Sequence, residues 1–137
     1  MPVEYTFGTT VRTNNGSVTV PGVRVSGDAE LVFDDMIPAG AVNRHIVMGL
    51  DVSELKGYVI VAEGLATGKT MTVKTNSTSS PVDTLTLTPA SPGVSWYAGA
   101  AYANPLSADV TAFYVSNDDT TARRFRVYAC ADITPGS

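Results

Sequence analysis

The sequence predicts an all-β protein: an antiparallel, jelly-roll-like β-sandwich of about ten strands with no long helix. Apolar and polar residues alternate, in segment after segment, with the period of a half-buried strand. These segments recur about every 8–12 residues and are separated by turns rich in Gly, Pro, Asn and Asp. No segment keeps helical spacing of apolar residues for more than one turn.

Size and composition fit one compact domain. The chain has 137 residues, of which 44% are hydrophobic, so a sizeable core is available. We therefore expect a single sandwich over 1–137, with an extended N-terminal arm at 1–12 and a short flexible tail at 133–137.

The charge balance argues against some partners. Only 16% of the residues are charged and the net charge is −4, whereas nucleic acids and anionic membranes select clusters of Lys and Arg. We expect neither as a partner. The single cysteine, Cys130, is expected to be a small buried hydrophobe without a disulfide. We expect neither a secretory signal, because residues 1–13 lack a basic start and an apolar stretch, nor a spanning helix, because no run approaches 18 apolar residues.

The N-terminal third reads as strands joined by tight turns. Alternation over 3–11 predicts a strand, and Asn15-Gly16 favours a type I′ hairpin turn after it. Pro21-Gly22 interrupts the returning strand and indicates a sheet edge or a β-bulge. Further alternating strands are expected over 29–36 and 42–50.

The middle of the chain contains the strongest strand signals. Asp51–Gly57 is the best helical candidate, a single turn ended by Gly57. Tyr58–Ala62 is a continuous apolar run, which predicts a central strand buried on both faces. Two Thr-rich strands, 71–75 and 84–88, are joined by a polar loop at 76–81 and form the clearest predicted hairpin.

The C-terminal third adds three strands around an Ala- and Gly-rich loop at 98–107. The strands are expected at 94–97, 112–115 and 124–129. Asp109-Val110-Thr111 repeats the order of residue types in Asp51-Val52-Ser53, and we interpret the two runs as equivalent corners of the sandwich.

Motifs that suggest chemistry have simpler interpretations. Gly64–Thr70 is one residue short of a phosphate-binding loop and is followed by a strand, so we interpret it as a turn. His45 is the only histidine and is expected on a strand face or at an interface, without a ligand set or catalytic partner. Asp118-Asp119 indicates a solvated turn rather than a cation site. Arg123, Arg124 and Arg126 indicate a solvated or pairing strand edge rather than a phosphate site. We expect no enzyme activity and no cofactor.

A set of short motifs resembles small virion-associated structural proteins of tailed bacteriophages. The motifs are DVSELK (51–56), TVKTNS (72–77), PVDTLTL (81–87), PGVSW (92–96) and NPLSADVTAFYVSN (104–117). The resemblance implies a capsid decoration protein on the outer surface of the virion, bound to the major capsid protein as a symmetric oligomer such as a homotrimer.

Candidate partner contacts lie in the N-terminal strand, the 76–80 loop and the aromatic region near 98–107. They are Tyr5, Phe7, Asn76, Ser77, Thr78, Trp96, Tyr97 and Tyr102. An alternative function stays open, a carbohydrate-binding module in which Trp96, Tyr97 and Tyr102 stack on a sugar ring.

Overall fold

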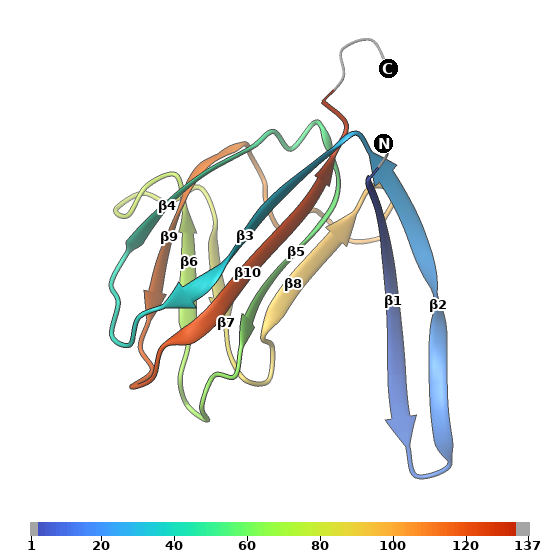
Figure 1. The fold of residues 1–137 in the computed structure, drawn as a ribbon, viewed down its shortest axis with the longest axis horizontal. Helices are drawn as coiled ribbons and strands as arrows, with labels where there is room; N and C mark the ends of the chain where they lie inside the picture. The colour runs from blue at the N-terminus through green and yellow to red at the C-terminus, as the bar shows by residue number, and fades with distance from the viewer. Residues whose placement is uncertain (1–2, 134–137) are drawn as a thin grey trace.

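The computed structural model describes residues 3–133 and contains ten β-strands within them (Figure 1). Their bounds are β1 (Val3–Thr13), β2 (Gly16–Gly27), β3 (Ala29–Ile37), β4 (Arg44–Leu50), β5 (Leu55–Glu63), β6 (Met71–Thr75), β7 (Thr84–Leu87), β8 (Gly93–Tyr97), β9 (Val110–Asn117) and β10 (Arg123–Ala131).

The strands β3 to β10 form a jelly roll. Sheet I has the order β3-β10-β5-β8 and sheet II the order β4-β9-β6-β7, with every neighbouring pair antiparallel. The chain crosses between the sheets after nearly every strand, and its last strand, β10, pairs with the first strand of the sandwich, β3. This is the double-sheet arrangement of a jelly roll, so the predicted fold class is confirmed.

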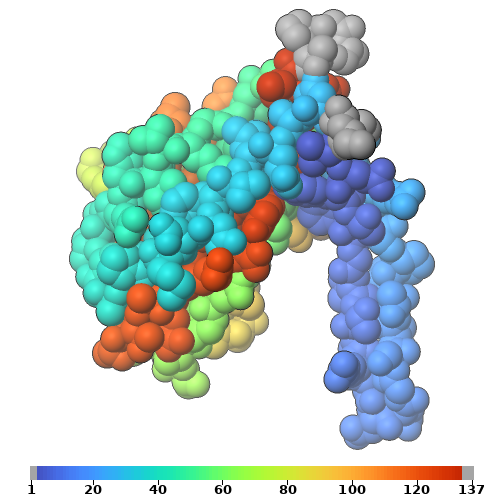
Figure 2. Space-filling view, viewed as in Figure 1, coloured from blue at the N-terminus to red at the C-terminus, as the bar shows by residue number. Residues whose placement is uncertain are grey.

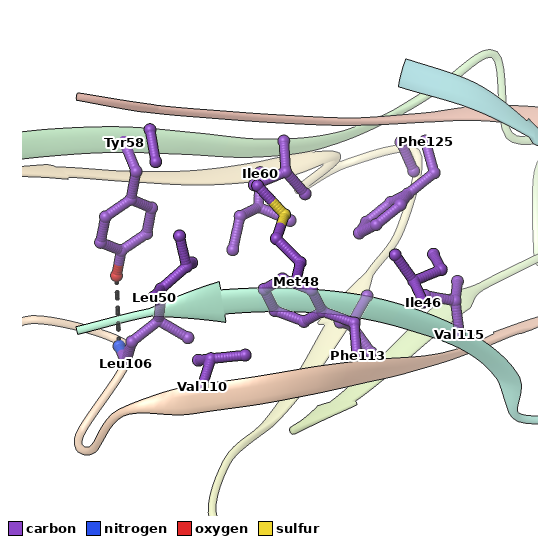
Figure 3. Packing of buried hydrophobic residues seen from close by; sticks show 14 of the residues in the cluster. Ile46, Met48, Leu50, Tyr58, Ile60, Leu106, Val110, Phe113, Val115 and Phe125 are labelled. Atoms are coloured by element: carbon purple, nitrogen blue, oxygen red, sulfur yellow. Dashed lines mark hydrogen bonds between the residues drawn. The ribbon is translucent and has the colours of Figure 1, made fainter. Parts of the chain in front are cut away.

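The core lies between the two sheets and follows from alternation along each strand (Figure 3). Sheet I contributes the fully buried side chains of Tyr58, Ile60 and Phe125, and sheet II contributes Phe113 and Val115. Phe113 and Phe125 meet edge to face, with ring centroids 6.4 Å apart, an arrangement that aromatic quadrupoles favour.

The strand β5 is central, as expected, but only one of its faces is fully buried. Tyr58, Ile60 and Ala62 point into the core, while Val59 and Val61 are half-buried on the outer face of sheet I. The prediction of burial on both faces is therefore wrong, because a two-layer sandwich leaves each sheet one outer face.

The predicted helical turn at Asp51–Gly57 is absent. The backbone amide of Glu54 donates to the carbonyl of Asp51 at 2.9 Å, which closes a β-turn, and β5 begins at Leu55. The Asp51 carboxylate accepts hydrogen bonds from the amide and hydroxyl of Ser53. Local side-chain bonding of this kind competes with helix formation, and it leaves Gly57 inside the strand.

The two Asp-led runs lie at the same corner. Leu50 pairs with Val110 at one end of the β4–β9 ladder. Beyond this pair, the amide of Val52 donates to the Asp109 carboxylate at 3.0 Å. The two runs therefore contact each other beyond one end of the β4–β9 ladder, in sheet II.

The strands β1 and β2 form a separate hairpin that projects away from the sandwich (Figures 1 and 2). The arm thus spans 3–27 rather than 1–12, because residues 3–13 pair with residues 16–27. The turn residues are Asn14 and Asn15, neither of which has a positive φ; the positive φ, 126°, is at Gly16. The predicted type I′ turn at Asn15-Gly16 is therefore wrong, since that turn needs positive φ at both central residues.

Pro21-Gly22 marks a β-bulge, one of the two predicted interpretations. The register shifts from Phe7↔Val23 to Thr9↔Val20, so Pro21 and Gly22 lie opposite Gly8 alone. At the other end of the chain, only Ile133 of the predicted tail at 133–137 lies within the described residues.

Candidate functional site

The root of the hairpin is seated on the outer face of sheet I. The Phe7 ring lies over Gly57, where a Cβ atom would come within 2.7 Å of the ring, and its centroid is 5.4 Å from that of Tyr97. The hydroxyl of Tyr5 donates to the Glu30 carboxylate at 2.5 Å. Burial, followed by this bond, raises the pKa of Tyr5 well above its usual range, so the hydroxyl keeps its proton.

The seat also explains the lone cysteine. Cys130 is fully buried, and its thiol lies 3.6 Å from the carbonyl oxygen of Val3. Burial raises the pKa of the thiol, which disfavours the reactive thiolate. Cys130 thus fills the joint between hairpin and sandwich, and its predicted role as a small buried hydrophobe is confirmed.

The bulge aligns the apolar residues of the hairpin on one face. In an unbroken strand, Val18 and Val20 would face opposite to Val23 and Val25, because neighbours alternate. The register shift at Pro21-Gly22 pairs Val20 with Thr9 and Val23 with Phe7, two residues that share a face of β1. We call the resulting surface the apolar hairpin face; it comprises Tyr5, Phe7, Thr9, Val11, Val18, Val20, Val23 and Val25.

A groove of about 720 Å³ lies between the apolar hairpin face and the outer face of sheet I, where Figure 2 shows the molecule hollowed. On the hairpin side it is lined by residues from β1 and β2, and on the sandwich side by β5, β8, β10 and the loop after β8. The lining residues are Glu4, Tyr5, Thr6, Phe7, Gly8, Thr9, Val20, Pro21, Val23, Val59, Ser95, Tyr97, Tyr102 and Tyr128.

The floor of the groove is a row of uncharged residues bordered by ion pairs. Tyr128, Val59 and Ser95, cross-strand neighbours on β10, β5 and β8, form this floor, and Val32 on β3 continues the row outside the groove. The next rows hold charged groups in contact: Arg124 with Asp34 at 2.6 Å, and Arg126 with Glu63 at 2.8 Å. The Arg126 guanidinium also lies 5.2 Å from the centroid of the Tyr128 ring and donates to its hydroxyl.

These contacts correct the interpretation of the arginine cluster. β10 pairs with strands on both sides and is not a sheet edge. Each of the three arginines contacts a carboxylate: Arg123 contacts Asp119, Arg124 contacts Asp34, and Arg126 contacts Glu63. The Arg124 guanidinium holds the pKa of Asp34 below its usual range, which favours the ionised form of the pair.

Four of the eight predicted contact residues meet at the groove. Tyr5, Phe7 and Tyr97 form its inner end, and Tyr102, which is 50% exposed, stands at its margin. The hydroxyl of Tyr102 donates to the carbonyl of Ser95 at 2.8 Å, which ties the 98–107 loop to β8. Residues far apart in the sequence therefore form one aromatic surface.

Trp96 lies on the other face of β8. It packs against the core, with its ring centroid 6.2 Å from that of Tyr58. Since adjacent strand residues point to opposite faces, Trp96 and Tyr97 do not share a platform.

The 76–80 loop is separate from the groove and is largely bonded to its own sheet. The Asn76 amide group donates to the carbonyl of Asp109 at 2.8 Å and accepts from the amide of Thr111 at 2.7 Å. The Ser77 hydroxyl accepts from the amides of Ser79 and Ser80. Thr78 is exposed and its carbonyl accepts a hydrogen bond from Lys74. Only the tip of this loop offers unbonded polar groups to a partner.

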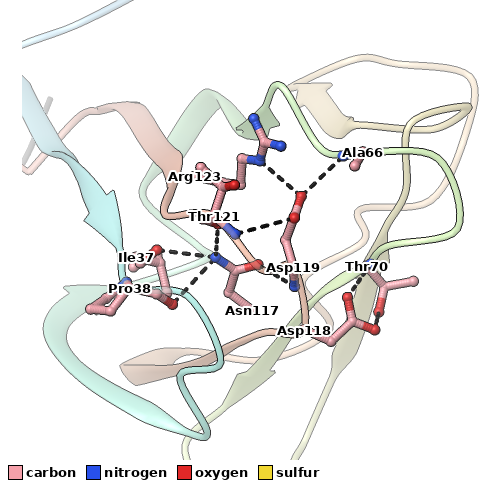
Figure 4. A network of polar contacts seen from close by, with 9 residues as sticks. All are labelled: Ile37, Pro38, Ala66, Thr70, Asn117, Asp118, Asp119, Thr121 and Arg123. Atoms are coloured by element: carbon pink, nitrogen blue, oxygen red, sulfur yellow. Dashed lines mark hydrogen bonds and ion pairs between the residues drawn. The ribbon is translucent and has the colours of Figure 1, made fainter.

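The phosphate-loop candidate at Gly64–Thr70 is a turn held by carboxylates (Figure 4). Asp119 accepts a hydrogen bond from the amide of Ala66 at 3.1 Å, and Asp118 accepts one from the amide of Thr70 at 2.7 Å. The strand β6 follows at Met71. The loop amides are already bonded to the carboxylates of Asp118 and Asp119, and a strand follows the loop where a phosphate loop needs a helix. The loop therefore cannot bind a phosphate in that way.

The same network shows that Asp118-Asp119 is more than the solvated turn that was predicted. Asp119 is only 2% exposed and contacts Arg123 at 2.8 Å. The fully buried Asn117 donates to the carbonyls of Ile37 and Thr121. These groups join the β9–β10 connection to the turns at 37–38 and 64–70.

Several other features are defined within residues 3–133. His45 lies on the exposed face of β4, stacked on Tyr114 with ring centroids 4.8 Å apart, which confirms its predicted place on a strand face. In this part of the chain, no cluster of three or more His, Cys, Asp or Glu side chains is arranged to hold a metal ion. Nor do residues 3–133 include a helix long and apolar enough to cross a membrane.

Sequence reasoning missed the valines of the hairpin. Val11, Val18 and Val20 are between 51% and 60% exposed, and Val20 lines the groove together with Val59 and Tyr128. A signal was present, because the valines change from even to odd positions at Pro21-Gly22. A bulge at this dipeptide brings them to one face.

Comparison of the chain with protein-family models, with curated proteins and with solved structures finds no match. The function is therefore argued from the fold, the groove and the exposed surfaces.

Proposed function

We propose that the chain is a non-enzymatic virion structural protein: a decoration protein that binds the outer surface of a tailed-bacteriophage capsid as a symmetric oligomer. The observation that carries this proposal is the projecting hairpin with its uncovered apolar face. Monomeric proteins rarely expose a contiguous apolar surface on an extended arm, and such surfaces mark protein–protein contacts.

The fold supports this proposal. Double-sheet jelly rolls are common among viral capsid domains and lectins, although a fold alone does not define a function. The motifs that resemble phage virion proteins lie between 51 and 117, in β5–β9 and in the connections before and between these strands, which are part of the sandwich. They include Asp51, Asn76 and Asp109, whose hydrogen bonds hold the corners of the jelly roll.

A second apolar surface suits a protein with two kinds of contact. Val47, 80% exposed, lies on the outer face of β4, and Val42, 78% exposed, lies in the connection before it. Both are at the edge of sheet II, while the hairpin is seated on sheet I. A decoration protein needs contacts with its own copies and with the capsid, and many weak contacts repeated by symmetry add up to tight binding.

The test is binding to undecorated capsids of the source phage. At micromolar concentrations the protein should co-sediment with these capsids and raise the temperature at which they lose their contents. Capsids whose decoration sites are already filled are the matched control and should bind no further protein. If the protein does not co-sediment with undecorated capsids, the proposal is contradicted.

A carbohydrate-binding function is the second candidate, and the aromatic lining of the groove favours it. Tyr97, Tyr102, Tyr5 and Phe7 could stack on a sugar, whereas Trp96 packs into the core. A glycan array should then show binding that Tyr102→Ala abolishes and a surface change outside the groove, such as Val47→Ala, preserves. Silence across the array contradicts this candidate.

A further inference from the structure

The apolar hairpin face extends beyond the surface that covers it. At the root, Tyr5, Phe7 and Val25 are half-buried against the sandwich. Further out, Val11, Val18 and Val20 are 51%, 60% and 56% exposed on the same face. The opposite face of this distal half carries Thr10, Arg12, Ser17 and Thr19 and is polar.

A hairpin of this kind is marginal without a cover. Two strands alone bury too little surface to be stable in water, and a third layer or strand is normally required. In the distal half, the ladder partners of residues 9–13 are residues 16–20 only, so no third strand pairs with it among the described residues. The bulge that turns all the valines to one side thus creates an amphipathic arm with one uncovered face.

A second copy of the chain offers a fitting surface. The outer face of sheet I already accepts the root half of the same apolar stripe, at Gly57, Tyr97 and Cys130. Next to this seat, the groove floor continues with Val59 and Tyr128. Since the distal valines continue the same stripe, a surface of the same chemistry suits them.

The net charges of the hairpin and of the rest of the chain are opposite in sign. The hairpin residues 3–27 carry Glu4, Arg12 and Arg24, a net charge of +1, so the remaining residues carry −5 of the total of −4. Arg12 is the only charged residue between positions 5 and 23, and it lies on the polar face. The carboxylates near the groove are already paired within their own chain: Glu4 with Arg24 at 3.3 Å, Asp34 with Arg124 at 2.6 Å and Glu63 with Arg126 at 2.8 Å.

We propose that the distal half of the hairpin of one copy lies in the groove of a second copy, with Val11, Val18 and Val20 against Val59 and Tyr128. Each chain then gives one arm and receives one, a head-to-tail contact that closes into a ring when the rotation allows it. This deepens the proposed decoration function by naming the contact between copies. It is tested on the purified chain without capsids, so either proposal can fail while the other stands.

The first experiment compares two double variants with the same added charge. Val11→Glu with Val18→Glu changes a cross-strand pair on the apolar face, and Thr10→Glu with Thr19→Glu changes the neighbouring pair on the polar face. Size-exclusion chromatography with light scattering should give an oligomer for the wild type and the Thr variant. The protein is applied at about 10–100 micromolar, a range that detects association of micromolar affinity. The Val variant should be a monomer whose sandwich unfolds in the same cooperative transition.

Three results would overturn the proposal. These are a wild-type monomer across this concentration range, an undiminished mass for the Val variant, or equal dissociation of both variants, which would indicate a charge effect without face specificity.

The second experiment identifies the seat. Chains carrying Val18→Cys are mixed with chains carrying Ser95→Cys, an exposed residue that lines the groove, while the native Cys130 is fully buried. Mild oxidation should link the two different chains, and Thr19→Cys, on the opposite face of the hairpin, should link to Ser95→Cys at least tenfold less. Linkage of Val18→Cys chains only to each other would show that hairpins pack face to face and that the groove is not the seat.

Discussion

The Asp119 carboxylate lies 2.8 Å from Nε of Arg123, and the same oxygen accepts a hydrogen bond from the amide of Ala66 at 3.1 Å (Figure 4). Asp119 is only 2% exposed. One buried charge therefore joins the start of β10 to the 64–70 turn. Removal of one partner of such a buried set is costly, because the other groups lose a strong acceptor.

This arrangement predicts a specific pH dependence. The amide of Ala66, followed by Arg123, lowers the pKa of Asp119 to about 2. Because the folded pKa lies below the unfolded value of about 3.9, the stabilisation is complete above pH 4 and is lost as the pH falls toward 2. Asp119→Asn should lower the melting temperature at pH 7 by several degrees and flatten the decline of stability between pH 4 and pH 2.

The neighbouring Asp118 provides the control. It bonds to the backbone and hydroxyl of Thr70 in an exposed position, so Asp118→Asn should have a smaller effect at pH 7. Thermal unfolding followed by circular dichroism across this pH range measures both. Part of the acid slope should persist in Asp119→Asn, since the pKa values of Asp34 and Asp51 are also lowered. An unchanged slope would contradict the assignment to Asp119.

The buried hydroxyl of Tyr58 predicts a second measurable loss. It donates to the side-chain oxygen of Asn104 and accepts from the amide of Leu106 at 3.2 Å, which anchors the 98–107 loop to the core (Figure 3). Tyr58→Phe should lower the free energy of unfolding by about 1 kcal/mol, the usual net worth of a hydrogen bond. Proteolysis within 98–107 should become faster. Urea denaturation of wild type and variant measures the first effect, and stability equal to the wild type would show that the hydroxyl contributes nothing.

Asn76 combines two contributions that substitutions can separate. Its φ of 70° is unfavourable for most residues, and its side chain bonds to Asp109 and Thr111. Asn76→Gly keeps the conformation and loses the bonds, whereas Asn76→Ala loses both. We expect destabilisation of about 1–3 kcal/mol for Gly, and more for Ala because of the left-handed backbone. Chemical denaturation of the two variants tests this order, which equal or reversed losses would contradict.

The sandwich could be predicted from the sequence because alternation and turn residues act locally. Val73 and Leu87, for example, are buried members of the predicted Thr-rich hairpin. The groove could not be predicted, because Phe7 and Tyr97, ninety positions apart in the sequence, meet only through tertiary packing. Trp96 and Tyr97 appear as one aromatic pair in sequence, and only the strand geometry sends them to opposite faces.

The seat of the hairpin predicts a selective effect at Gly57. A Cβ atom at this position would lie 2.7 Å from the Phe7 ring, so Gly57→Ala must displace the ring. Amide hydrogen exchange should then accelerate in residues 3–27 by tenfold or more while the core strands keep their protection. Gly49→Ala is the control, since nothing lies within 4 Å of its Cβ position. Exchange that rises equally in the hairpin and in the core would instead indicate global destabilisation.

The exposed valine on β4 separates the two contacts of the proposed decoration protein. Val47 is 80% exposed on the outer face of sheet II, while its neighbours Ile46 and Met48 point into the core. Val47→Glu should therefore leave folding and the oligomer intact, because the hairpin and groove lie on sheet I. If this edge faces the capsid, the buried charge should weaken co-sedimentation with undecorated capsids at least tenfold, since an unpaired charge at an interface is costly. Val47→Thr keeps the shape of the side chain and adds no charge, so this variant should bind capsids almost as the wild type does. Capsid binding unaffected by Val47→Glu would assign the capsid contact to another surface, with the exposed tip of the 76–80 loop as the next to be tested.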